Sequence, residues 1–232
     1  MTKNLNLNWQ TQEVTPTLIN GSDALMIYNS LPKQARVGLR YDEASKTMIG
    51  STPIAVANLD SFARKYGART PNLRDLSRPE VMRIAKGKHY IDSRNLVARL
   101  QTDSDWPLNN SLLRTIYELA EQKEGSIRYP FMIEGFSFVP NSKDKNGYGL
   151  TLVAGSDFKV IQDERFDGKY NGESFSEVDK LGIPNFDKKG SRTWYTKNKG
   201  LSRLYLYRDL YLLSDYGGLT LSSDYGRVVF LK

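Results

Sequence analysis

The strongest constraint on the fold of this chain is a change of residue periodicity near residue 125. Between residues 103 and 124, apolar residues recur at helical spacing after a group of capping residues, and Gly125 ends the pattern. From residue 127 onward, β-favouring residues dominate, as in RYPFMIEGFSFVP. Such a change is typical of the α+β class, because helices and strands then occupy separate stretches. We predict an α+β fold with helices concentrated in residues 58–124 and an antiparallel β-sheet that includes a C-terminal three-stranded meander.

Three shorter helices are predicted before residue 103. The first covers residues 62–66 before a glycine, and the second follows the capping box SRPE at residues 77–80. The third covers residues 92–100, where apolar residues form a stripe. The segment KGKH at residues 86–89 separates two of these helices and raises the hypothesis of a helix-turn-helix. The turn lacks the glycine spacing of that motif, which favours ordinary helix packing.

Several strands and turns are predicted from local patterns. Residues 18–57 contain the candidate strands ALMIY, RVGLR and TPIAVANL, and AGSD at residues 154–157 is interpreted as a hairpin turn. The tetrapeptide SDYG occurs at residues 214–217 and again at 223–226, and each copy is interpreted as a turn of the meander. Because successive hairpins of a meander lie at opposite ends, we expect the two copies to lie apart.

Three regions are predicted along the chain. Residues 1–17 form a polar N-terminal arm, residues 18–125 a mixed α/β region with basic helices, and residues 126–232 a mainly antiparallel β region. The last two regions are either separate or one continuous domain. Within the third, residues 163–191 are rich in Gly, Asp, Asn and Lys, and such a long excursion is either functional or mobile.

Missing residue types and motifs exclude several classes of site. The chain has no cysteine and one histidine, His89, which excludes disulfides, thiolate zinc sites, cysteine nucleophiles and histidine-rich metal sites. Neither a phosphate-binding loop nor a strand-linked GxGxxG motif is present, so we expect no cofactor and no metal ion. No apolar run approaches the roughly 20 residues that span a bilayer, and the N-terminal residues lack a signal-peptide pattern. We therefore expect a cytoplasmic protein without membrane contact.

A metal-dependent nuclease is the enzymatic alternative. Asp157 and Lys159 have the acid-x-lysine spacing of many such nucleases, and Asp144, Asp163 and Glu164 are further groups that could join them around Mg²⁺. Asp157 also follows a Gly-Ser pair, so a turn aspartate explains the same pattern. We expect a protein without enzymatic activity and keep the nuclease as a third hypothesis.

The net charge of +7 is concentrated in two basic blocks. Residues 60–101 contain ten Lys and Arg against four acids, a balance of +6, and residues 188–208 contain seven Lys and Arg and no acid. Between the blocks, residues 102–187 have nine Lys and Arg against fifteen acids, a balance of −6. Basic blocks attract polyanions such as nucleic acid, although they are also explained as solvated faces or as partners of the acidic middle.

The second basic block is interleaved with aromatic residues. From residue 203 onward the chain alternates as a strand does, so that leucines face one side while Tyr205, Tyr207 and Tyr211 face the other. Arg208 breaks the alternation and predicts a bulge or a strand end. The tyrosines either stack unpaired bases or form a packed layer beneath residues 163–191.

Non-enzymatic binding of nucleic acid, DNA or RNA, is the function that these patterns predict. Single strands are favoured, because stacking on aromatic rings needs unpaired bases, while basic side chains hold the phosphates. The predicted contacts are Arg94, Arg99, Lys188, Lys189, Arg192, Trp194, Tyr195, Lys197, Lys199, Arg203, Tyr205 and Tyr207.

The N-terminal arm suggests a second class of function. Leu5, Leu7 and Trp9 alternate with asparagines, as in a strand that could add to the sheet of a neighbour. Self-association of this kind suits a structural or protein-interaction subunit of an assembly, of the viral or mobile-element type. A frayed terminus, or a strand paired within its own domain, is the alternative.

Overall fold

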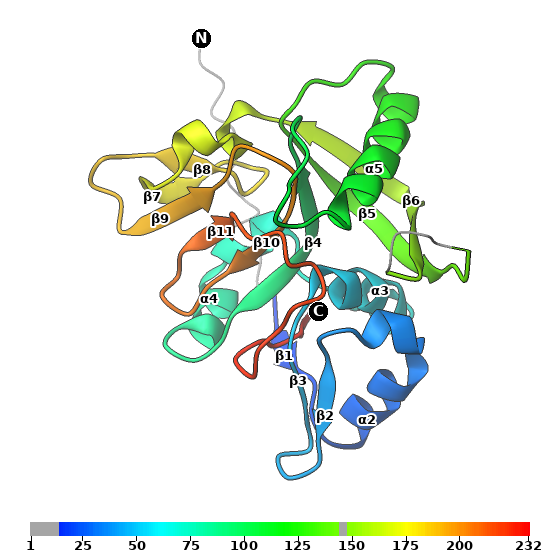
Figure 1. The fold of residues 1–232 in the computed structure, drawn as a ribbon. Helices are drawn as coiled ribbons and strands as arrows, with labels where there is room; N and C mark the ends of the chain where they lie inside the picture. Colours follow the sequence, from blue (N-terminus) through cyan, green and yellow to red (C-terminus); the bar gives the residue numbers. More distant parts are fainter. Residues whose placement is uncertain (1–13, 144–147) are drawn as a thin grey trace.

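An eight-stranded mixed sheet dominates the computed structural model, which describes residues 14–143 and 148–232 (Figure 1). The strand order is β6-β5-β4-β10-β11-β9-β7-β8. Neighbouring strands are antiparallel except β11 and β9, which run parallel. The strands are β4 (Ile91–Ala98), β5 (Phe131–Pro140), β6 (Leu150–Gln162), β7 (Glu173–Val178), β8 (Pro184–Phe186), β9 (Arg192–Thr196), β10 (Leu201–Leu206) and β11 (Leu212–Ser214).

Two small sheets and a set of helices complete an α+β fold, as predicted. One small sheet pairs β1 (Pro16–Leu18) with β12 (Val229–Leu231), and the other pairs β2 (Arg40–Asp42) with β3 (Thr47–Ile49). The α-helices are α2 (Gly21–Ser30), α3 (Pro53–Arg64), α4 (Pro79–Ala85) and α5 (Asn109–Glu124). Short 3₁₀ helices are η1 (Lys33–Arg36), η2 (Leu73–Ser77), η3 (Glu164–Phe166) and η4 (Gly168–Tyr170).

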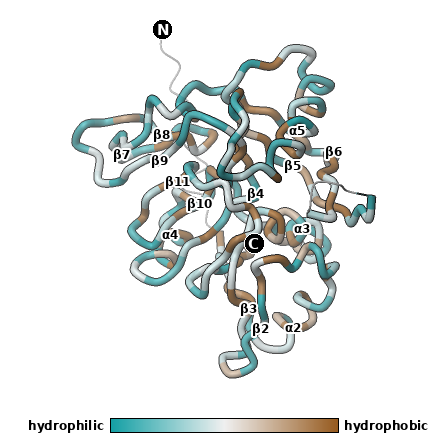
Figure 2. The backbone as a smooth tube through the Cα atoms, viewed as in Figure 1, coloured by the Kyte–Doolittle hydropathy of each residue, from teal (hydrophilic) through white to brown (hydrophobic). Residues whose placement is uncertain are grey.

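The central strands are buried on both faces. Ile91 and Val97 of β4 belong to one hydrophobic cluster, which also contains residues of η2 and α4. Leu96 and Ala98 of the same strand belong to a second cluster, with residues of α3 and α5. Successive side chains of a strand point to opposite faces, so the two clusters lie on opposite sides of the sheet. Figure 2 shows hydrophobic residues along α3 and the neighbouring strands.

Burial on two faces explains the main error in the predicted helices. The expected helix at residues 92–100 is wrong, because this segment is β4, in which all eight residues are buried. A strand covered on both faces has no polar side in contact with water, so its apolar residues need not alternate with polar ones. The candidate strands ALMIY and TPIAVANL are also wrong, since they lie in α2 and α3.

The C-terminal meander does not form as predicted. Residues 203–213, expected as one strand, instead contain the end of β10, a turn and the start of β11, which pair with each other, and residues 219–222 form no strand. Instead of completing a meander, β12 pairs with β1 at the opposite end of the chain. The turn predicted at residues 154–157 is likewise absent, because β6 continues through it and pairs with β5 on both sides of a register shift.

The sheet joins regions that were distinguished in the sequence. β4, from residues 18–125, lies between β5 and β10, which belong to residues 126–232. The excursion at residues 163–191 contributes η3, η4, β7 and β8 and continues the sheet beyond β9. Most of the predicted N-terminal arm lies outside the described residues, although its last two residues begin β1. Within the described ranges, no helix is long and apolar enough to cross a membrane.

Candidate functional site

A pocket of about 230 Å³ gathers five of the 14 tyrosines of the chain. Two arginines and a short polar segment complete its wall. We call this site the tyrosine pocket, and its lining residues are Tyr90, Arg203, Tyr205, Tyr207, Arg208, Tyr216, Leu221, Ser222, Ser223 and Tyr225.

Backbone pairing brings these residues together from distant parts of the chain. Tyr90 precedes β4, and its N–H donates to the carbonyl of Tyr225 at 3.1 Å. Its own carbonyl accepts from the N–H of Arg227 at 3.0 Å, so the loop before β12 is fixed against the start of β4. The N–H of Arg203 in β10 donates to the carbonyl of Tyr216 at 3.1 Å. The pocket therefore depends on long-range strand contacts.

A buried ion pair between Arg203 and Asp92 lies beside the rings of the pocket. Arg203, only 3% exposed, donates from Nε to Oδ1 of the fully buried Asp92 at 2.6 Å, and from Nη2 to the other carboxylate oxygen. Its Cζ lies 5.2 Å from the ring centroid of Tyr90 and 5.0 Å from that of Tyr205. Burial acts to lower the pKa of Arg203, but the charge of Asp92 raises it above the ordinary value. Arg203 therefore fixes the two rings.

The hydroxyls of the pocket tyrosines differ in their hydrogen bonds. The hydroxyl of Tyr90 lies 2.7 Å from Oγ of Ser222 and accepts from the N–H of Ser223 at 3.1 Å, which fixes the ring. The hydroxyls of Tyr205, Tyr207, Tyr216 and Tyr225 have no hydrogen-bond partner among the described residues. Burial raises the pKa of Tyr205, so its hydroxyl stays protonated at neutral pH. These four hydroxyls are free to donate to or accept from a bound molecule.

Arg208 is the cation at the rim of the pocket. Its Cζ lies 5.4 Å from the ring centroid of Tyr207 and 5.6 Å from that of Tyr225. No carboxylate of the described residues lies within ion-pair distance of its guanidinium. The N–H of Gly87 donates to the carbonyl of Arg208 at 2.8 Å, which places the α4–β4 turn against it. That turn carries the exposed Lys86 and Lys88, so the two basic blocks meet beside the pocket.

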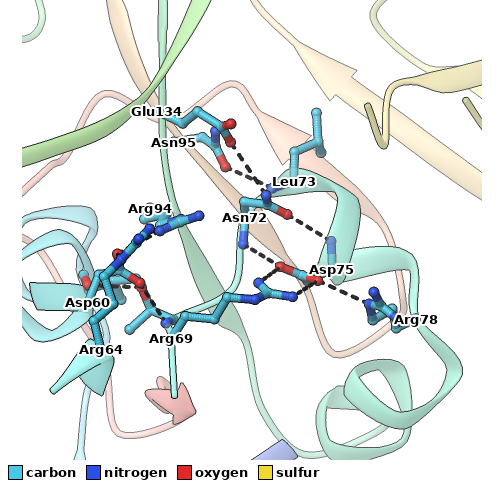
Figure 3. A network of polar contacts seen from close by, with 12 residues as sticks. Asp60, Arg64, Arg69, Asn72, Leu73, Asp75, Arg78, Arg94, Asn95 and Glu134 are labelled. Atoms are coloured by element: carbon cyan, nitrogen blue, oxygen red, sulfur yellow. Dashed lines mark hydrogen bonds and ion pairs between the residues drawn. The ribbon is translucent and has the colours of Figure 1, made fainter. Parts of the chain in front are cut away.

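Several arginines of the first basic block are paired within the fold. Arg94, predicted to contact phosphates, is buried and donates to Asp60 at 2.6 Å, as does Arg64 at 2.6 Å (Figure 3). Although burial raises the pKa of Asp60, the charge of Arg94 and the hydrogen bond from Arg64 hold it below the ordinary value. Asp75 has a similar role for Arg69 in the same network (Figure 3). Arg94 thereby joins β4 to α3, and Arg69 joins the segment after α3 to η2.

Arg99 is buried without a carboxylate partner. Its Nε donates to the carbonyl of Phe166 at 2.8 Å, and its terminal nitrogens donate to the hydroxyls of Ser202 at 2.8 Å, Thr196 at 2.6 Å and Ser214 at 3.0 Å. Burial lowers its pKa to about 9, so the guanidinium keeps its charge at neutral pH. Arg99 was predicted to hold phosphates, but in the structure it joins four segments of the interior.

Three cations of the second basic block also have internal partners. Arg192 is buried and donates to the carbonyl of Leu210 at 2.9 Å and to Oγ of Ser77 at 3.0 Å. Lys197 pairs with the buried Asp103 at 2.6 Å, and Lys199 lies 3.8 Å from the same carboxylate. Each of these three side chains would have to leave a partner in order to reach a phosphate.

The remaining predicted contacts are divided between the interior and an outer turn. Trp194 is fully buried, and the ring of Tyr195 packs edge-on against Tyr211 at 5.5 Å. Lys188 and Lys189 are exposed in the turn between β8 and β9. Of the predicted aromatic contacts, Tyr205 and Tyr207 are the ones that line the tyrosine pocket.

The residues of the nuclease hypothesis do not gather into a metal site in the described part of the chain. Asp157 pairs with Arg64 at 2.6 Å, and Lys159 with Glu134 at 3.2 Å. Asp163 pairs with Arg165 and Glu164 with Lys169, at 2.6 and 2.8 Å. No group of three or more His, Asp or Glu side chains in residues 14–143 and 148–232 could hold a metal ion. Asp144 lies outside these ranges.

Three tyrosines of the pocket were missed by the sequence analysis. Tyr216 and Tyr225 come from the two SDYG copies, which were interpreted as turns lying apart. That expectation is wrong, because residues 219–222 do not form the intervening strand and both copies reach one pocket. The repeated tetrapeptide was the available signal. Tyr90 had no local signal, since its role depends on contacts with residues more than 100 positions away.

Comparisons of the chain with protein-family models, with curated proteins and with solved structures give no match. The tyrosine pocket and the lysines beside it are the features from which a function can be inferred.

Proposed function

We propose that this chain is a non-enzymatic protein that binds single-stranded nucleic acid at the tyrosine pocket. One unpaired base enters the pocket, and the neighbouring phosphates bind Arg208, Lys86 and Lys88. The position of Arg208 carries the proposal: an arginine without a carboxylate partner lies at the rim of an aromatic pocket and contacts the turn that bears two exposed lysines.

The rings suit an unpaired base. Base stacking on aromatic side chains contributes about 1–3 kcal/mol per base and tolerates every base, because each has a π face. The volume of about 230 Å³ lies below the roughly 300–1,000 Å³ of sites for drug-sized ligands, which limits the pocket to a small group such as a single base. Tyr225 is 57% exposed and offers its ring at the entrance. Paired bases of a duplex cannot enter such a pocket, so single strands are favoured.

The cations supply the affinity for the backbone. Lysines and arginines that neutralise phosphates release condensed counterions, and for single strands the slope of log K against log salt is about −0.7 for each phosphate contact. Three contacts, at Arg208, Lys86 and Lys88, predict a slope of about −2. The buried arginines have partners inside the protein, so they stabilise the fold and do not contact the nucleic acid; these are Arg94, Arg99, Arg192 and Arg203.

The test measures binding of labelled single-stranded and duplex oligonucleotides over a series of salt concentrations. Tyr225→Ala should weaken single-strand binding about 5-fold to 150-fold, the equivalent of 1–3 kcal/mol, with an unchanged salt slope. Lys88→Gln should make the slope less negative by about 0.7. Matched controls are Tyr66→Ala, at a 63% exposed tyrosine outside the pocket, and Lys123→Gln on α5.

Two results would overturn this function. The first is binding no stronger than that of an unrelated protein with similar charge. The second is an equal effect of Tyr225→Ala and Tyr66→Ala, which would show that the pocket takes no base.

A second candidate function is a structural or interaction subunit of an assembly, in which the N-terminal arm mediates self-association. An edge of β1 that pairs with no described strand, and an apolar groove beside it, favour this function. A viral or mobile-element role and the expected cytoplasmic location belong to the same proposal. The described residues of the nuclease hypothesis do not support it, since they are held in separate ion pairs.

A further inference from the structure

An apolar groove of about 440 Å³ lies between α2, α3 and the β1–β12 pair. Its exposed wall includes Met26, which is 52% exposed, and Tyr66, which is 63% exposed. Large apolar side chains that are exposed together around a groove are typical of a surface that binds protein. The apolar lining comes mainly from Leu18, Met26, Phe62, Ala63, Tyr66 and Phe230.

The strand beside the groove has one edge that pairs with no described residue. β1 pairs with β12 and has no second neighbour among the described strands. Thr15 and Lys232 exchange both backbone hydrogen bonds, at 3.1 and 3.3 Å. Because hydrogen-bonded pairs alternate along an antiparallel pair, Pro16 and Leu18 turn their backbone groups to the other edge. The C=O groups of both residues and the N–H of Leu18 are therefore available to another strand.

The chain contains a segment whose chemistry matches the groove. Thirteen residues precede the described part of the chain and lead directly into β1. Within them, Leu5, Leu7 and Trp9 alternate with asparagines. When extended, they present three apolar side chains on one face, at intervals of roughly 7 Å. Strand addition to an edge combines backbone hydrogen bonds with pockets for alternate side chains, and the edge of β1 and the apolar groove provide both.

The segment that connects the arm to β1 indicates whether the groove binds the arm of its own chain or that of a second copy. To run antiparallel to its own β1, the arm would have to reverse direction within residues 10–15, QTQEVT. This segment contains none of the Gly, Pro, Asn or Asp residues that favour tight reversals. We infer that the groove receives the N-terminal arm of a second copy of this chain, in a reciprocal exchange. A two-fold dimer follows, in which each copy gives and receives one arm.

This inference rests on the assembly function proposed above, and the sedimentation behaviour of the full chain tests it. The full chain should form a dimer whose fraction rises with concentration, whereas a variant lacking residues 2–13 should remain monomeric. Met26→Asp should weaken the dimer at least tenfold, because a carboxylate would be buried against apolar side chains. Leu25→Asp is the matched control, since Leu25 is 37% exposed on the same helix but does not line the groove. It should leave dimerisation unchanged.

Two controls keep the outcomes distinct. Circular dichroism checks that the shortened variant and both aspartate variants are folded. A labelled peptide of residues 1–13 should bind the shortened variant but not its Met26→Asp form. A full chain that is monomeric at every concentration overturns the inference, as does a dimer that persists without the arm. Oligonucleotide binding per protomer depends on the tyrosine pocket, so Met26→Asp should retain it. The result of this binding measurement tests the nucleic-acid function and not the dimer.

Discussion

Replacing Asp92 by asparagine tests whether the buried ion pair below the tyrosine pocket holds this part of the fold. The carboxylate is fully buried and accepts two hydrogen bonds from Arg203, whose side chain is 3% exposed. Asparagine preserves the size of the side chain but removes its charge. The amide oxygen can still accept one hydrogen bond from Arg203, beside the carbonyls of Leu221 and Ser51 at 2.7 and 3.1 Å, but the guanidinium loses one acceptor and its buried counter-charge.

The expected loss is large for a single substitution. Removing one partner of a buried pair destabilises a protein by about 3–5 kcal/mol, because the other charge remains uncompensated. For domains of 150–250 residues, 1 kcal/mol corresponds to about 2–4 °C in Tm, so this chain should lose roughly 6–20 °C. Replacing both charges at once, with Asp92→Leu and Arg203→Met, should recover much of the stability, since no buried charge remains. Both variants should also weaken oligonucleotide binding, because Arg203 lies over the rings of Tyr90 and Tyr205.

Urea unfolding, followed by circular dichroism, measures the free energy of unfolding of each variant. Asp157→Asn is the matched control, because its pair with Arg64 is exposed, with side chains 42% and 45% accessible. Exposed pairs contribute about 0–1 kcal/mol, so this control should stay close to the unmodified protein. An effect of Asp92→Asn no larger than that of Asp157→Asn would refute the role of the buried pair.

Two further predictions concern pH and backbone conformation. Burial, together with the charges of Arg227 and Lys88, lowers the pKa of His89 below 6.5, so the unfolded state binds the proton more readily. The free energy of unfolding should therefore decrease as the pH falls below about 6.5. His89→Gln should remove part of this dependence in urea titrations from pH 8 to 5. Equal pH profiles for the variant and the unmodified protein would contradict the prediction. Gly135→Ala should destabilise far more than Gly125→Ala in thermal unfolding. Both glycines have positive φ, 75° and 76°, but only at Gly135 would a Cβ overlap the backbone of Asp157, so equal losses would refute the packing argument.

Local sequence patterns were sufficient where local chemistry decides the structure. The helix predicted in residues 103–124 is present as α5, from Asn109 to Glu124, and Gly125 ends it with φ 76°. The alternation predicted from residue 203 onward holds within β10, where Leu204 and Leu206 lie in a hydrophobic cluster while Tyr205 lines the pocket, but residues 207–211 form a turn and do not continue the strand. β10 ends at Leu206, which agrees with the strand end or bulge predicted near Arg208. In each case, residues that are close together in the sequence were sufficient for the prediction.

The same patterns failed where residues distant in the sequence decide the environment. β4 contains buried Asp92 and Arg94, which looked like the polar positions of a helix because their partners are not sequence neighbours. Arg94 pairs with a residue 34 positions away and Asp92 with one 111 positions away. A charged side chain has the same appearance in a sequence whether it faces water or a buried counter-charge. The number of basic residues in a block therefore did not predict how many are free to bind a phosphate.

For this protein, the sequence by itself determined the α+β class, the helix α5, the two faces of β10 and the absence of cysteine chemistry. Periodicity, capping residues and composition act over a few residues, and those features depend on nothing else. The tertiary structure decided that the four arginines predicted to bind phosphate are internal, that the backbone of Arg208 contacts Gly87 between Lys86 and Lys88, and that both SDYG copies reach one pocket. These outcomes depend on which strands pair across the sheet, and that pairing is set by burial over the whole chain.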